Sequence, residues 1–164
     1  MQLLWEKIQS TLDKKTVNDL KKGATDIDLA LIESIVGHTL PNDFKDFLKI
    51  YNGQKGEVSG IFTDRYFLST DEIAANWKIW KDLEDSGTFA DCTAETDSQI
   101  KNNWWHEGWI PFTDDGSGNH LCIDLAPTSH GNVGQIIEMW HDDNQRKYIA
   151  KNFTEFLHLE FNLT

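Results

Sequence analysis

WWHEGWIPFTDDGSGNHLCIDLAP, residues 104–127, is the stretch of sequence that decides the fold. It holds two short apolar runs separated by residues 114–119, which are rich in Gly, Asp and Asn. Because these residue types tolerate a positive φ or hydrogen-bond their own backbone, the pattern predicts two strands joined by a turn. Pro111 cannot donate a backbone hydrogen bond, so we expect it at a sheet edge or a strand end.

The second apolar run has the alternation of a strand. Leu121, Ile123 and Leu125 alternate with Cys122 and Asp124. Successive side chains of a strand point to opposite faces of the sheet. We therefore expect this strand to have one buried face and one wetter face.

Helical patterns precede this stretch. Residues 2–13 are amphipathic and predict a short helix, whereas residues 14–23 are polar and their form stays open. A second helix is expected to begin at Thr25, with Asp28 near the positive end of its dipole, and to stop at Gly37.

The sequence from Leu40 to Gly53 predicts a third helix. Pro41 suits its first turn, because a backbone N–H at that position has no partner to lose. Apolar side chains at positions i, i+3, i+4 and i+7 form a core-facing stripe: Phe44, Phe47, Leu48 and Tyr51. Asn52-Gly53 is expected to give the helix a left-handed exit.

The middle of the chain predicts a hairpin and a further helix. Residues 58–68 have the pattern of strand, turn and strand, with the turn around Thr63-Asp64. Ser69 with Glu72 forms a capping box for a helix whose apolar face is Ile73, Trp77 and Trp80. Residues 82–101 are polar and acidic, and we expect a long irregular loop there.

The C-terminal part predicts two more strands and a closing helix. The strands are expected within residues 134–140 and 147–150, and Asn152 with Glu155 caps the helix. Helices, then a meander, then a helix predict one α+β domain over residues 1–164. In that domain the N-terminal helices and the closing C-terminal helix pack on a mostly antiparallel sheet.

The charge of the chain limits its partners. The net charge is −12 and the pI is about 4.7. It is concentrated in residues 82–124, where ten carboxylates face one lysine, a balance of −9, whereas residues 1–24 have a balance of +2. Nucleic acids and anionic membranes bind clustered Lys and Arg, so neither is an expected partner. A basic protein would be attracted instead.

Cysteines and hydropathy favour a cytoplasmic protein. Cys92 and Cys122 are too few for a disulfide framework, and we expect reduced thiols. The first residues contain no apolar run of signal-peptide length, and no window approaches the ~20 apolar residues of a membrane span.

The loop at residues 114–119 fails as a calcium site. With Asp115 at position one of an EF-hand loop, position six should be Gly and is His120, and position twelve should be Glu and is Ala126. The histidines that could build a transition-metal site lack the spacing of ligand pairs: His106, His120, His130 and His141. We expect no metal and no cofactor.

Catalytic patterns are equally weak. Cys92 has no adjacent basic group, Cys122 has the pattern of a buried strand residue, and no Gly-x-Ser-x-Gly elbow or phosphate-binding loop is present. Asp114-Asp115 beside tryptophans leaves a hydrolase or a carbohydrate-binding protein open as an alternative. Trp104 and Trp105 are adjacent, so on a strand they would face opposite sides and one would be exposed.

Three stretches together resemble the SUKH superfamily, which is named partly for a yeast regulator of cell-wall assembly. They are the helix Leu40–Gly53, with its Leu-Pro, Phe-Leu and Asn-Gly pairs; the hairpin Trp109–Leu125; and the C-terminal block of Gly134–Ile137, His141-Asp142 and Asn152–Leu157. The resemblance covers most of residues 25–161 and is weakest at 82–103.

This resemblance implies a single α+β domain without enzymatic activity, and it gives no catalytic residue to carry over. Bacterial members of the superfamily are cast as immunity proteins that bind and neutralise a toxin, often a nuclease. Eukaryotic members act as regulatory or scaffold proteins. Fold resemblance does not identify the partner.

We expect first an immunity-type protein that occludes the active surface of a cognate basic toxin with its carboxylates. The alternative is a regulatory or scaffold domain of the same fold, followed by a carbohydrate-binding protein or hydrolase. The predicted contact residues combine acidic groups with a tryptophan anchor, Trp104 or Trp105: Asp82, Glu84, Asp85, Asp91, Glu95, Asp97, Trp104, Trp105, Glu107, Asp114 and Asp115.

Overall fold

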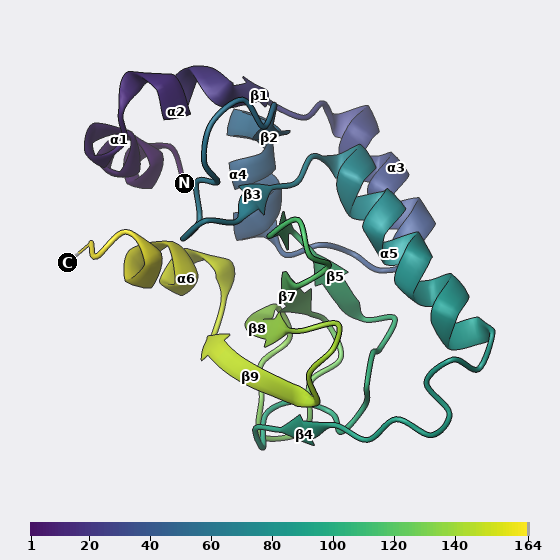
Figure 1. Ribbon diagram of the computed structural model, residues 1–164. Helices are drawn as coiled ribbons and strands as arrows, with labels where there is room; N and C mark the ends of the chain where they lie inside the picture. The colour runs from purple at the N-terminus through teal and green to yellow at the C-terminus, as the bar shows by residue number, and fades with distance from the viewer. Residues whose placement is uncertain (164) are drawn as a thin grey trace.

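The largest sheet of the structure, a computed structural model that describes residues 1–163, has five strands and lies in the lower half of the molecule as drawn in Figure 1. Its strand order is β4 (Glu95–Thr96), β9 (Gln145–Ala150), β8 (Gln135–Met139), β7 (His120–Asp124) and β5 (Trp109–Pro111). Neighbouring strands are antiparallel except β4 and β9, which are parallel. The predicted hairpin is confirmed as β5 and β7, and Pro111 lies on the edge strand.

The prediction of a wetter face on β7 is wrong. All five residues of this strand are buried, including Cys122 and Asp124. The second face is covered because Trp80 of the helix α5 (Thr70–Asp85) packs on the His120 ring, with ring centroids 6.3 Å apart. Further along the same face, Gln135 donates to the Gln99 carbonyl at 3.0 Å.

The N-terminal helices follow the predicted signals. They are α1 (Gln2–Thr11), α2 (Lys14–Asp19), α3 (Asp26–Val36) and α4 (Asn42–Ile50). The Thr25–Asp28 capping box is present, and Gly37 ends α3 with a φ of +71°. The undecided residues 14–23 form α2 and the short strand β1 (Leu20–Lys22).

The predicted left-handed exit at Asn52-Gly53 is wrong. The helix α4 ends at Ile50 and runs directly into the strand β2 (Tyr51–Gln54), which pairs with β1. Gly53 does have a φ of +83°, but it lies within β2. A Cβ there would come within 2.4 Å of the Ser69 backbone nitrogen, so close backbone approach explains the glycine.

The predicted hairpin at 58–68 is mostly turn. Thr63 and Asp64 have positive φ angles between the bridged residues Phe62 and Arg65. A short strand, β3 (Tyr66–Phe67), then pairs with β6 (Thr113–Asp114). The following helix α5 has the expected Ser69–Glu72 capping box but extends to Asp85. The predicted start of an irregular loop at Asp82 is therefore wrong.

An aromatic cluster joins the helices to the sheet. Neighbouring rings have centroids 4.9 to 6.4 Å apart, mostly in edge-to-face or tilted arrangements. Its members come from α4, from the strand region and from the closing helix α6 (Phe153–Glu160): Phe44, Phe47, Phe62, Phe67, Phe112, Phe153 and Phe156.

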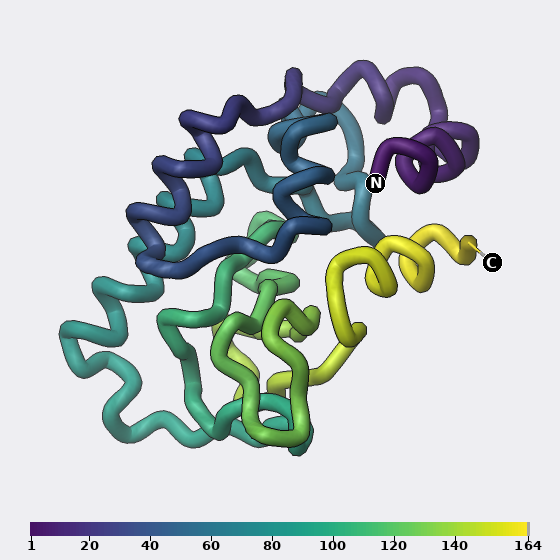
Figure 2. The backbone as a smooth tube through the Cα atoms, turned by 180° about the vertical axis from the view of Figure 1, so that it is seen from behind, coloured from purple at the N-terminus to yellow at the C-terminus, as the bar shows by residue number. Residues whose placement is uncertain are grey.

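Seen from behind, α3 crosses in front of α5, and the segment between α5 and β4 runs along the lower edge of the molecule (Figure 2). This segment leaves the end of α5 and returns to the sheet only at β4. The segment, residues 86–94, is therefore a border of the molecule that begins at the end of α5 and ends at β4.

Candidate functional site

A groove of about 420 Å³ lies where α5 ends. The last turn of α5, the loop at residues 86–94 and the segment at residues 102–105 form its walls. The lining combines small, polar and aromatic side chains: Glu84, Gly87, Phe89, Ala90, Cys92, Thr93, Ala94, Asn102, Asn103, Trp104 and Trp105. This volume is within the range of pockets that hold small ligands or inserted side chains.

Aromatic rings make the inner side of the groove. Phe89 lies between Trp80 and Trp104, with ring centroids 5.7 and 6.4 Å away. Trp104 is partly exposed, whereas Trp105 is 1% exposed and packs edge-on against Trp77. Of the two predicted anchors, only Trp104 therefore offers a surface to a partner.

A buried arginine that was not among the predicted site residues holds this wall in place. Arg146 is 1% exposed, and its Nε and Nη2 donate to the Trp104 carbonyl at 3.0 and 2.7 Å. Its Nη1 donates to the carbonyls of Asp143 and Gln145. The guanidinium carbon also lies 4.9 Å from the centre of the Trp104 ring. Burial lowers the pKa of Arg146 to about 10, so the side chain is still cationic at neutral pH.

Six of the predicted acidic residues fall between residues 82 and 97, in the last turn of α5 and the segment that follows it, and we call them the acidic rim: Asp82, Glu84, Asp85, Asp91, Glu95 and Asp97. Of these six, Glu84 lines the groove, whereas Glu95 and Asp97 line a separate hollow beside β9. All six are exposed. No Lys or Arg occurs between residues 82 and 100, so no cation of this segment offsets them.

Three members of the rim already have internal partners. Asp82 pairs with Lys78 at 3.0 Å and Asp85 pairs with Lys81, both one helical turn away. Asp97 accepts a hydrogen bond from the Tyr148 backbone at 2.7 Å. Within residues 1–163, the carboxylates of Glu84, Asp91 and Glu95 make no ion pair. These three are the groups that remain for an external cation.

The other predicted acidic residues lie apart from the groove. Asp114 is in β6, which pairs with β3, and Asp115 accepts hydrogen bonds from Ser117 and Asn119 in its own turn. Although burial raises it, these bonds hold the pKa of Asp115 below its ordinary value. Glu107 is exposed on the segment before β5. The groove therefore brings together Glu84, Trp104 and Trp105 of the predicted residues, whereas Glu95 and Asp97 line a separate hollow and Asp114 lies in β6.

The described residues offer no metal cluster and no activated nucleophile. Among residues 1–163, no three His, Cys, Asp or Glu side chains are placed to hold a metal ion. Cys122 is fully buried, which raises the pKa of its thiol. His120 is buried too, and burial lowers its pKa, so its ring is neutral near pH 7. In the same part of the chain, no helix has both the length and the apolar character that crossing a bilayer requires.

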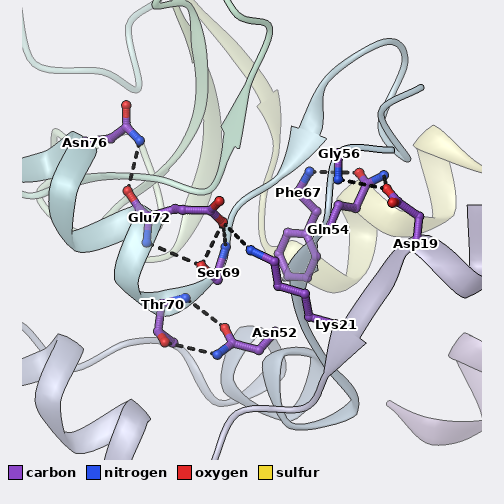
Figure 3. A network of polar contacts seen from close by, with 10 residues as sticks. All are labelled: Asp19, Lys21, Asn52, Gln54, Gly56, Phe67, Ser69, Thr70, Glu72 and Asn76. Carbon is purple, nitrogen blue, oxygen red and sulfur yellow. Dashed lines mark hydrogen bonds and ion pairs between the residues drawn. The ribbon is translucent and has the colours of Figure 1, made fainter. Parts of the chain in front are cut away.

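A second polar cluster joins β1, β2 and α5 (Figure 3). Asn52 accepts from the Thr70 backbone at 2.8 Å, and Glu72 both caps α5 and pairs with Lys21 at 3.2 Å. Beside them, the buried carboxylate of Asp19 accepts hydrogen bonds from the Gln54 side chain and from two backbone N–H groups. Burial opposes ionisation here, but these bonds hold the pKa of Asp19 below its ordinary value. The Asn52–Thr70 hydrogen bond and the Lys21–Glu72 ion pair hold the N-terminal strands on α5.

Comparison with known proteins gives a family and several relatives. The SMI1 / KNR4 family (SUKH-1) matches residues 23–158. The cell wall biosynthesis/cell cycle regulator smi1 of Schizosaccharomyces pombe is 30% identical over 149 residues, which cover 82% of this chain and 30% of that protein. The glucan synthesis regulatory protein of Neurospora crassa is 27% identical, over 93% of this chain and 36% of that protein.

A third relative is the cell wall assembly regulator SMI1 of Saccharomyces cerevisiae. It is 24% identical over 181 residues, covering 88% of this chain and 34% of that protein. The chain thus spans about a third of the length of the curated relatives it matches.

Proposed function

The chain belongs to the SMI1/KNR4 (SUKH-1) family, and from this premise we propose that it is a non-enzymatic regulatory or scaffold domain that binds a basic protein partner through the acidic rim. The relatives are named as regulators of cell-wall or glucan synthesis. Those names favour a regulatory role over the toxin-neutralising role that the sequence analysis placed first.

The observation that carries this proposal is the excess negative charge of the rim, of which only Asp82 and Asp85 are paired with lysines. Six carboxylates lie between Asp82 and Asp97 with no Lys or Arg among them, and Glu84, Asp91 and Glu95 make no ion pair within the described residues. Such a surface raises the local concentration of a cationic partner and speeds its association by a factor of about 10 to 1,000. The partly exposed Trp104 beside the rim supplies the apolar contact that retains the partner.

The test is binding by charge-reversed variants. The partner is first captured from the native host, identified and purified, and its association rate is then measured at several salt concentrations. The rim variant carries Glu84→Lys, Asp91→Lys and Glu95→Lys. The control carries the same charge change on exposed residues elsewhere, Glu6→Lys, Asp46→Lys and Glu57→Lys.

We expect the rim variant to associate at least about tenfold more slowly and to lose most of the salt dependence, whereas the control stays close to the unmodified protein. Equal effects of the two variants would show that net charge alone acts. No effect of either would reject the rim as the binding surface.

A toxin-neutralising role is the second candidate, and the same rim favours it. A nuclease that binds nucleic acid has a cationic surface, which six carboxylates would attract and cover. The discriminating experiment mixes the protein with a toxin encoded beside its gene. A complex that blocks the toxin's activity would establish this role, and the lack of a complex would leave the regulatory role.

A further inference from the structure

We propose that the groove at the end of α5 is a receptor for one arginine side chain, presented by an extended segment of the partner protein. This inference rests on the proposed function and specifies its site. In this proposal the Glu84 carboxylate pairs with the guanidinium of the bound arginine. The rings of Phe89 and Trp104 contact the flat face of the guanidinium and the methylene stem. The side chains of Asn102 and Asn103 bind the backbone of the partner segment.

Glu84 differs from the other two acidic residues of its helical turn because it makes no ion pair. Asp82 and Asp85 each have a lysine four residues earlier, and both ion pairs form. The residue four positions before Glu84 is Trp80, which is buried and packs against Phe89 instead. Of the three acids on this turn, Glu84 lines the groove and makes no ion pair, and the only cation that acts on it from this helix, Lys81, is already paired with Asp85.

The aromatic wall favours arginine over other basic groups. A guanidinium is planar, stacks on aromatic rings and pairs with a carboxylate through two parallel hydrogen bonds, whereas an ammonium is a strongly hydrated point charge. The Trp104 ring already accepts the guanidinium of Arg146 at 4.9 Å. The contact between a guanidinium and an aromatic ring that we propose for the partner's arginine is thus already made within the protein by Arg146 and Trp104.

The groove also has groups for the backbone of a peptide. The side-chain amides of Asn102 and Asn103 line it and make no hydrogen bond within residues 1–163. An asparagine amide has both a donor and an acceptor, so it can pair with a peptide unit of an extended chain. The indole N–H of Trp105, also in the lining, has no partner in the described part of the chain.

The experiment titrates the protein with the capped peptide acetyl-Gly-Ala-Arg-Ala-Gly-amide and follows the tryptophan indole N–H signals by NMR. Matched peptides carry citrulline, which is the neutral isostere, or lysine. We expect the arginine peptide to shift the signals of Trp104 and Trp105 with a Kd on the order of 1 mM, because a single side chain gives little binding energy. The citrulline peptide should leave both signals in place.

Two substitutions on the same helical turn separate the groove from general charge. Glu84→Gln should weaken the arginine peptide about tenfold, whereas Asp82→Asn, which removes the same charge from a residue already paired with Lys78, should weaken it less than about twofold. Both residues are exposed, and the unmoved signals of the remaining tryptophans report that each variant is folded.

Equal weakening by the two variants, or no shift of the two indole signals, would overturn the receptor. Equal binding of the lysine peptide would overturn its preference for arginine. These outcomes differ from failure of the proposed function. If the purified partner still needs the acidic rim but binds the Glu84→Gln variant normally, only the groove assignment is wrong.

Discussion

The substitution Arg146→Met tests how the groove wall is held. Arg146 donates four hydrogen bonds to three carbonyls, and two of them reach the Trp104 oxygen at 3.0 and 2.7 Å. Methionine has a similar length but cannot donate. The carbonyls of Asp143 and Gln145 belong to exposed residues and can return to water, so the main loss is at Trp104.

Two effects oppose each other in this substitution. Removing a buried cation relieves its desolvation, which is the cause of the lowered pKa of Arg146. That pKa, about 10, is lowered because the burial of the cation is only partly compensated, but it is still well above 7, so Arg146 is charged at neutral pH. Leaving a buried acceptor without its charged donor costs about 1–3 kcal/mol, and lost packing on Trp104 adds to it. Because the relieved desolvation offsets part of this cost, we expect a net loss of about 1–2 kcal/mol, or about 2–8 °C in the melting temperature.

Urea unfolding at pH 7 measures this loss, and Lys147→Met is the matched control. Lys147 lies next along β9, is exposed, and should change stability by less than about 0.5 kcal/mol. In Arg146→Met the indole signal of Trp104 should also move. Equal stability of the two variants would refute the account in which carbonyl bonds of Arg146 fix the groove wall.

Four further outcomes are expected. Gly53→Ala should destabilise the protein by about 3 kcal/mol in urea unfolding, because φ is +83° and the new Cβ meets the Ser69 backbone. Phe112→Ala should cost about 3–5 kcal/mol in the same assay, since its buried ring packs against four phenylalanines. Burial lowers the folded-state pKa of His120, so the unfolded chain binds the proton more readily than the folded one. The contribution of His120 to the free energy of unfolding should therefore be complete above about pH 6.5 and be lost as the pH drops below it. In urea unfolding at several pH values, His120→Asn should lose less stability over this range than the unmodified protein. Glu84→Lys should raise stability by about 0.5 kcal/mol in thermal unfolding while abolishing binding of the arginine peptide.

Local signals in the sequence predicted local structure well. The capping boxes at Thr25 and Ser69 are confirmed because their partners lie three residues away in the chain. The sequence does not show in the same way which distant segments will pack over a strand. The alternation of β7 gave no sign that α5 and residues 97–105 would bury its second face.

The candidate site shows the same division. Its carboxylates were predicted to act together, but of those from 82 to 97 only Glu84 lines the groove, and Glu95 and Asp97 line a separate hollow beside β9. Asp114 and Asp115 were grouped with them only by charge, and the pairing of β6 with β3 places them elsewhere. Arg146 was missed because a lone arginine in a strand gives no sign that it will be buried.

The end of α5 shows a conflict between helix stability and charge that suggests a binding role. Helix C-termini favour cations, since the macrodipole places negative charge there. The last turn of α5 has no basic residue and instead carries Asp82, Glu84 and Asp85. Lys78 and Lys81 pair with Asp82 and Asp85, whereas Glu84 makes no ion pair and is attracted only to the already paired Lys81.

Such conflicts are expected where function opposes stability. The carboxylate that weakens the helix end is the one that lines the groove, beside the ring held by Arg146. If Glu84 were only a solubilising surface charge, the substitution Glu84→Lys would leave stability equal or higher and would not affect binding of the arginine peptide. A gain in stability joined to a loss of arginine binding would show that the helix end keeps this charge for a partner.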